Sequence, residues 1–131
     1  MVLEAAQCED TLGELVALHR GAHDEPDIDW WTSGERLADA VEGLPDPDAG
    51  AIAAHYRGLL RKRNMVVHGI WLHGSSGHIT MMRAKSTKSS PLPPRYNVGL
   101  ESEKALATLA DEFNRIERRA ANAISRYMGL A

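Results

Sequence analysis

The sequence predicts an all-α domain: a four-helix bundle with a small β-hairpin inserted between the third and fourth helices. Apolar residues recur at intervals of three and four over about 1–20, 49–68 and 100–128, which is the spacing of amphipathic helices. Clusters of glycine and proline separate these segments. With 131 residues the chain has the length of one domain, so we assign 1–131 to a single domain.

The first predicted helix covers residues 1–20. Its apolar stripe has spacings of three and four residues and consists of Ala5, Cys8, Leu12, Leu15 and His19. We expect Cys8, which lies on this stripe, to be a buried structural thiol rather than a reactive one. The following stretch, residues 21–32, is broken by Gly21 and Pro26 and predicts a loop.

A capping box predicts a short second helix. Thr32 is followed three residues later by Glu35, so the hydroxyl and the carboxylate can satisfy the first backbone amides, and Gly43 ends the helix. The turn LPDPDAG comes next, with Asp48 as the expected N-cap of the third helix.

Arg63 lies in the middle of the apolar stripe of the third predicted helix, 49–68. A guanidinium in that position must be paired, or must face a cleft or a second subunit. Two plainer interpretations stay open. The side chain could extend to the edge of the core, or it could pair with an acid from the N-terminal half.

The pattern changes between the third and fourth helices. The segment of about 70–84 has two short apolar runs around a Gly-Ser-Ser-Gly turn and predicts a β-hairpin. The basic, proline-rich stretch of about 86–97 predicts a loop. The last helix, about 100–128, keeps its apolar spacing for three heptads, which is typical of a bundle or dimer seam.

Charge is divided unevenly along the chain, although the net charge is only -3. Residues 1–50 carry 13 acidic and 2 basic side chains, whereas residues 51–131 carry 5 acidic and 13 basic ones. A basic half of this kind is typical of proteins that bind a polyanion such as RNA. The alternative is that the acidic half neutralises the basic half, within the fold or across a dimer.

Several classes of protein are not indicated. No apolar run approaches the roughly 20 residues of a membrane span, and the first residues do not resemble a signal peptide. The single cysteine cannot form an internal disulfide, so we expect a cytoplasmic protein. We expect no cofactor and no metal. His73 and His78, near His68, have no cysteine or carboxylate beside them, and we interpret them as surface imidazoles.

The segment RKRNMVVHGIW, residues 61–71, resembles the signature of the HEPN superfamily (higher eukaryotes and prokaryotes nucleotide-binding domains). That signature is an arginine, often followed by a polar residue, and a histidine after a gap of four to six residues. Arg63, Asn64 and His68 supply it with a gap of four. Arg61 and His68 form a second match with a gap of six, although the following asparagine and the stripe position favour Arg63.

The resemblance implies a metal-independent endoribonuclease, acting as a toxin or in phage defence, with its active site between two subunits. His68 would be the general acid/base that activates a ribose 2′-OH, and the product would be a 2′,3′-cyclic phosphate. Arg63 would hold the scissile phosphate and Asn64 would orient it. These roles suit the side chains, because an imidazole titrates near neutral pH and a guanidinium binds phosphate through two hydrogen bonds. The implied partners are RNA, a second copy of the chain, and an antitoxin or other protein.

Five further basic residues are predicted to contact RNA phosphates: Arg57, Arg61, Lys62, Arg83 and Lys85. Two further features bear on the resemblance. On an ideal helix Arg63 and His68 lie about 140° apart, which favours a site shared by two subunits. One branch of the family has a tyrosine two residues after the histidine, where this chain has Ile70. The alternative functions are a catalytically inactive dimerisation or partner-binding module, and an RNA-binding protein without catalysis.

Overall fold

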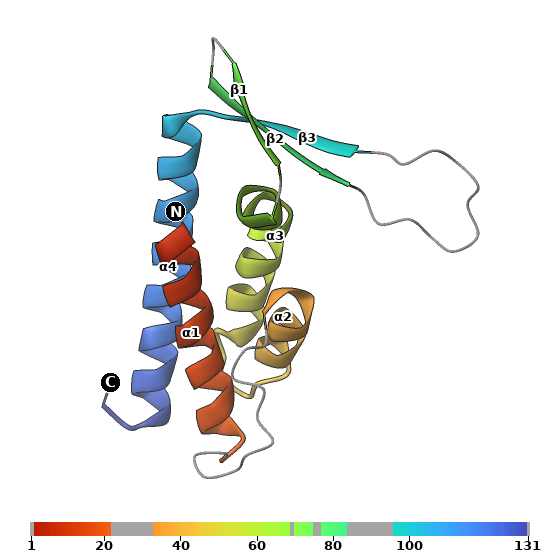
Figure 1. Cartoon of the computed structure of the whole chain (residues 1–131). Helices are drawn as coiled ribbons and strands as arrows, with labels where there is room; N and C mark the ends of the chain where they lie inside the picture. The colour runs from red at the N-terminus through yellow and green to blue at the C-terminus, as the bar shows by residue number, and fades with distance from the viewer. Residues whose placement is uncertain (1, 22–32, 69, 75–76, 84–95, 131) are drawn as a thin grey trace, which may run out of the picture.

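The computed structural model describes residues 2–21, 33–68, 70–74, 77–83 and 96–130, with side chains described for 3–21, 33–66 and 102–130. Its elements, in chain order, are α1 (Val2–His19), α2 (Gly34–Glu42), α3 (Ala49–His68), β1 (Ile70–Gly74), β2 (Gly77–Arg83), β3 (Tyr96–Glu101) and α4 (Glu103–Tyr127). The four predicted helices are confirmed (Figure 1). None of the described helices is long and apolar enough to span a membrane.

Helices α1 and α4 run side by side in the same direction (Figure 1). Thr11 on α1 bonds Glu117 on α4 at 3.4 Å, and two turns further along the His19 ring meets the Tyr127 ring at 4.6 Å between centroids. The paired positions advance together along both helices, which requires a parallel arrangement. Parallel helices cannot be joined by a short loop, and most of the chain lies between these two.

Helix α3 runs antiparallel to α4. Asp48, just before α3, bonds Arg119 near the end of α4, whereas His55 further along α3 bonds Glu112 nearer the start of α4. Helix α2 packs beside α3 and brings its N-terminal end close to the middle of that helix, where Tyr56 lies. The last turns of α3 therefore lie at the end of the molecule where α4 begins (Figure 1).

One hydrophobic core joins all four helices. The stripe predicted for the first helix is buried at Ala5, Cys8, Leu12 and Leu15. The stripe of α4 is buried from Leu109 to Ala123, but Tyr127 is 46% exposed, so the buried seam ends about one turn before the helix does. The expectation of a buried thiol is confirmed, and burial raises the pKa of Cys8 to about 12, with the charges of Glu9 and Glu117 adding to the shift.

Two predicted helix starts were wrong by a few residues. Ser33, not Thr32, is the N-cap of α2, and its side chain makes no capping bond. Thr32, the predicted cap, lies outside the described residues. Helix α4 begins at Glu103 rather than near Leu100, because Ser102 caps it by accepting a hydrogen bond from the amide of Ala105 at 3.0 Å.

Between α3 and α4 the described chain forms an antiparallel sheet in the order β1-β2-β3. Strands β1 and β2 lie within the segment predicted as a hairpin, and His73 and His78 are register partners. Strand β3 was not predicted: its residues were assigned to the loop and to the start of the last helix. It pairs with β2 from His78↔Glu101 to Arg83↔Tyr96. The sheet projects from the end of the bundle (Figure 1).

Candidate functional site

The basic run of α3 contains a nearly buried ion pair. Arg63 donates to the same carboxylate oxygen of Glu9 on α1 from Nε, at 2.9 Å, and from Nη2, at 2.8 Å. Its Nη1 donates to Oδ1 of the neighbouring Asn64 at 2.9 Å. The arginine side chain is only 14% exposed and that of Glu9 only 10%. Of the interpretations left open by the sequence, pairing with an acid of the N-terminal half is the one observed.

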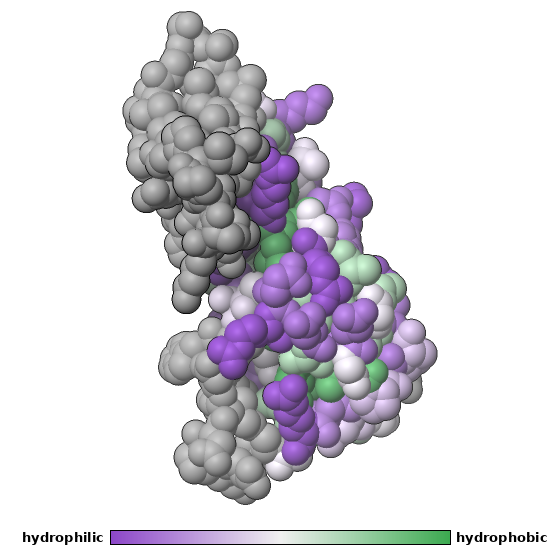
Figure 2. Space-filling view, turned by 90° about the vertical axis from the view of Figure 1, so that its right-hand side faces the viewer, coloured by the Kyte–Doolittle hydropathy of each residue, from purple (hydrophilic) through white to green (hydrophobic). Residues whose placement is uncertain are grey.

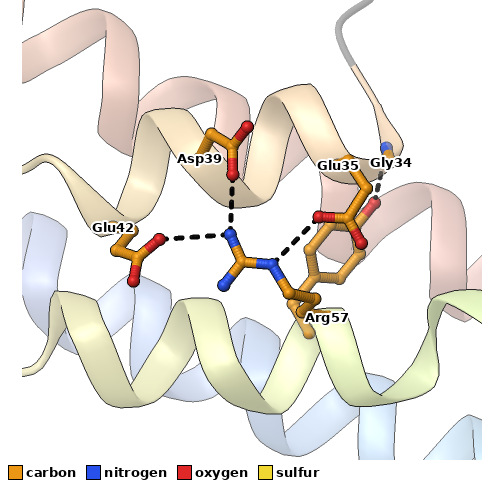
Figure 3. Close-up of polar contacts among 6 residues, drawn as sticks. Gly34, Glu35, Asp39, Glu42 and Arg57 are labelled. Atoms are coloured by element: carbon orange, nitrogen blue, oxygen red, sulfur yellow. Dashed lines mark hydrogen bonds and ion pairs between the residues drawn. The ribbon is translucent and has the colours of Figure 1, made fainter.

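The carboxylate of Glu9 also acts on Tyr56, which is fully buried on α3. Burial raises the pKa of the Tyr56 hydroxyl, and the negative charge of Glu9 raises it further. The phenolic oxygen accepts a hydrogen bond at 3.1 Å from the amide of Gly34, the first residue of α2 (Figure 3). Glu9 therefore interacts with both Arg63 and Tyr56, in a polar cluster that joins α1, α2 and α3.

Arg57 is held by the acidic face of α2 (Figure 3). Its Nε donates to Glu35 at 2.9 Å, and its Nη2 donates to Asp39 at 2.7 Å and to Glu42 at 3.2 Å. These bonds, that to Glu35 first, raise the pKa of the Arg57 guanidinium. The structure thus places this predicted RNA contact among three carboxylates, which disfavour the approach of a phosphate.

The structure describes the other predicted site residues to different extents. Arg61 is exposed and Lys62 is half-buried, both in the helical turn before Arg63 and Asn64. His68 is the last residue of α3, and its side chain lies outside the described part. Arg83 ends β2, and Lys85 lies outside the described residues. The structure therefore brings Arg63 and Asn64 together, and places Arg61 and His68 on the same helix.

Among the described side chains, three more pairs of an acid and a base join α4 to α3 or to the turn before α3, and none was predicted from the sequence. Arg119 donates two hydrogen bonds to the carboxylate of Asp48, at 3.2 and 2.7 Å. Arg126 likewise donates two to the carboxylate of Asp46, at 3.1 and 2.9 Å. His55 and Glu112 approach to 2.5 Å between α3 and α4. For the two arginine pairs the only sequence signal was the charge asymmetry, because acids of the N-terminal half there neutralise bases of the C-terminal half within the fold. Both partners of the His55–Glu112 pair lie in the C-terminal half.

The surface reflects this pairing. Figure 2 shows the face on the side of α2, where hydrophilic residues cover much of the described surface and hydrophobic residues emerge between them. Among the described side chains, no group of three or more histidine, cysteine, aspartate or glutamate residues is arranged to hold a metal ion. The candidate site therefore consists of Glu9 on α1 together with the basic residues 61–63 and Asn64 near the end of α3.

No family model matches the chain, and neither a curated protein nor a solved structure matches it. The resemblance to the HEPN superfamily accordingly depends on the residues of the motif and on the helical fold.

Proposed function

We propose that this protein is a metal-independent endoribonuclease of the HEPN type, with its site at the end of α3. The observation that carries the proposal is the position of the motif. Residues 61–68 form the last two turns of a continuous helix in a four-helix domain, and the helix ends on His68 itself. The run of three basic residues, 61–63, lies one to two turns before this histidine and favours the approach of a polyanion to that end of the molecule.

The reaction that suits these side chains is internal transesterification of RNA. An imidazole of His68 takes the proton of a ribose 2′-OH, and the 2′-oxygen forms a bond to the adjacent phosphorus. The bond from phosphorus to the 5′-oxygen breaks, and a protonated imidazole donates a proton to that oxygen. The products are a 2′,3′-cyclic phosphate and a free 5′-hydroxyl. An arginine offsets the charge that develops on the phosphate, and the amide of Asn64 orients the arginine to which it is bonded.

The helical geometry favours a site built from two copies of the chain. Because α3 is helical throughout residues 63–68, five residues turn the chain by about 500°, which leaves these two positions about 140° apart. One helix cannot easily direct both side chains at one phosphate. Two copies that meet at this end supply two arginines and two histidines to one cleft. An enzyme of this kind fits the role of a toxin or a defence effector.

The second candidate is a catalytically inactive module that binds a partner protein. The observation that favours it is the internal neutralisation of charge. Arg57, Arg63, Arg119 and Arg126 all bind carboxylates of the same chain, so the basic half offers fewer cations to RNA than its composition suggests. Such a module would neither cleave RNA nor bind it with a steep dependence on salt.

Incubation of purified protein with mixed cellular RNA in EDTA tests the proposal. The proposal expects cleavage that persists in EDTA, leaves 2′,3′-cyclic phosphate ends and is lost in the His68→Ala variant. His19→Ala, which removes an imidazole that lies beside Tyr127 at the opposite end of the bundle, is the matched control and should cleave like the wild type. Equal cleavage by wild type and His68→Ala would mean that a contaminant or another residue is responsible. Absence of cleavage and of RNA binding would favour the partner-binding module.

A further inference from the structure

We propose that two copies of this chain pair through the outer face of α3, between α2 and α4, with their α3 helices running parallel. The inference rests on the proposed function in one respect, that the site is built from two copies, and it names the surface that brings them together. The pairing involves α2, α3 and α4 and can be measured without RNA.

Helices α2 and α4 lie on opposite sides of α3. Arg57 binds α2 and His55 binds α4, and positions two residues apart on a helix differ by about 200° around its axis. The side of α3 that lies between these contacts and away from the core is its outer face. Between positions 49 and 66 the exposed residues of α3 all lie on this face: Gly50, Ala51, Ala54, Gly58 and Arg61.

This outer face carries few of the polar side chains that usually cover a helix in water. Apart from Arg61 it consists of glycine and alanine, and a Cβ added at Gly50 or Gly58 would meet no atom within 4 Å. Nothing inside the chain therefore requires glycine at these two positions, where each costs about 1 kcal/mol relative to alanine. A face without bulk lets a second helix approach to about 8 Å between axes, the short end of the usual range.

The α2 border of this face has an excess of negative charge. Three carboxylates of α2 surround the single guanidinium of Arg57 (Figure 3). Their side chains are 64%, 69% and 58% exposed, in the order Glu35, Asp39 and Glu42. On the α4 border the most exposed partner of an ion pair is instead a base, because Arg115 is 64% exposed and donates one bond, of 3.1 Å, to Glu112.

These unlike borders decide how two copies meet under two-fold symmetry. With antiparallel α3 helices, α2 of each copy would lie against α2 of the other, and carboxylates would face carboxylates. With parallel α3 helices, α2 of each copy lies against α4 of the other, so the acidic border faces Arg115 of the second copy. Attraction between opposite charges favours the parallel arrangement.

The contacts within one chain place Asp39 and Arg115 at the same height along α3. Gly34 meets Tyr56, and α2 and α3 run antiparallel because a short turn joins them, so Asp39, five residues later, lies beside about position 51. On α4, positions 112 and 119 lie beside 55 and 48 of α3, which places Arg115 beside position 52. In the parallel pair, Asp39 of one copy therefore faces Arg115 of the other.

The parallel arrangement also agrees with the site proposed above. It brings the C-terminal ends of both α3 helices, and with them both copies of residues 61–68, to the same end of the dimer. An antiparallel pair would place them at opposite ends.

A charge exchange between the two borders tests this pairing. Arg115→Glu and Asp39→Arg each place like charges opposite one another in the dimer, whereas the double variant restores opposite charges with their signs reversed. Within one chain the two residues bind different partners, Glu112 and Arg57, so a rescue cannot come from a contact inside the chain.

A second pair of variants tests the centre of the face. Ala54→Arg places bulk and charge there. Ala121→Arg is the matched control, because Ala121 is an exposed alanine nine residues after Glu112 and so on the opposite side of α4. Sedimentation equilibrium measures the dissociation constant of every variant, and circular dichroism measures its melting temperature.

The expected result is a wild-type dimer, a weakening of about 10-fold in each single charge variant, and recovery to within a few-fold in the double variant. Ala54→Arg should be a folded monomer, and Ala121→Arg should pair like the wild type. A monomeric wild type, a dimeric Ala54→Arg, or a double variant as weak as the single ones would overturn the pairing. A wild-type dimer that cleaves no RNA would overturn the proposed function and leave the pairing in place, so the two failures are distinguishable.

Discussion

Arg63 donates two hydrogen bonds to one carboxylate oxygen of Glu9, 54 residues earlier in the chain, in a pair that is almost closed to solvent. The pair explains how an arginine can occupy the centre of an apolar helical stripe. It also joins α3 to α1, two helices that otherwise meet mainly through their shared core. The following predictions depend on this pair and on the other contacts between the helices.

Breaking the pair from one side should destabilise the fold. Arg63→Met leaves the Glu9 carboxylate nearly buried and unpaired, and loss of one partner of a buried ion pair costs about 3–5 kcal/mol. The double variant Glu9→Leu/Arg63→Met should recover most of that loss, because two apolar side chains need no counter-ion. Urea unfolding of the single and double variants measures both changes. A single variant as stable as the wild type would contradict the description of the pair as buried.

Tyr56→Phe should cost about 1–2 kcal/mol. The ring would still fill the core, but the amide of Gly34 would lose its acceptor at the start of α2. Unfolding followed by circular dichroism measures the change, with Tyr127→Phe as control, because Tyr127 is 46% exposed. A loss as large in the control as in Tyr56→Phe would contradict the role given to the Gly34 contact.

Acid should weaken the ion pair between Asp46 and Arg126. The hydrogen bond from Arg126 lowers the pKa of the Asp46 carboxyl, which is 5% exposed. A carboxyl whose pKa is lowered by folding stabilises the native state above its unfolded value of about 3.9, and this contribution is lost as pH falls through the folded value. Melting temperatures between about pH 7 and 2 should therefore decline less in Asp46→Asn than in the wild type. The same decline of melting temperature with pH in both proteins would show that this ion pair does not contribute to the acid sensitivity.

The Cys8 thiol should be inert in the folded protein. Burial raises its pKa to about 12, so very little thiolate exists at pH 8, and the side chain is fully covered. A thiol reagent such as 5,5′-dithiobis(2-nitrobenzoate) should react slowly in buffer and rapidly in denaturant. Rapid labelling in buffer would indicate that α1 separates from the core under native conditions.

The helices could be predicted from the sequence because their signals are local. Alternating spacings of three and four residues identified the buried positions of α1 and α4, and Gly43 ends α2 as expected. Strand β3 could not be predicted, because it has only six residues and one of them is a glycine. Only its pairing with β2 defines this segment as a strand. The start of α4 was misplaced for the same reason.

The candidate site could be predicted only in part. The motif identified the segment and the conflict between Arg63 and its apolar stripe, but not the partner that resolves the conflict. The first half of the chain contains 13 acids, and spacing along the sequence does not distinguish Glu9 from the others. The same holds for Arg57, Arg119 and Arg126, whose carboxylate partners depend on which helices become neighbours.

The central claim is that the end of α3 cleaves RNA through the ribose 2′-OH without a metal ion. The most direct test uses an RNA oligonucleotide that the protein cleaves at one site in EDTA, and a copy with a single 2′-deoxy substitution at the nucleotide before the cleaved bond. We predict that the substituted copy resists cleavage and that mass spectrometry of the unsubstituted product finds a 2′,3′-cyclic phosphate. Cleavage of the substituted copy at the same bond would contradict the claim, as would a product that carries a 5′-phosphate.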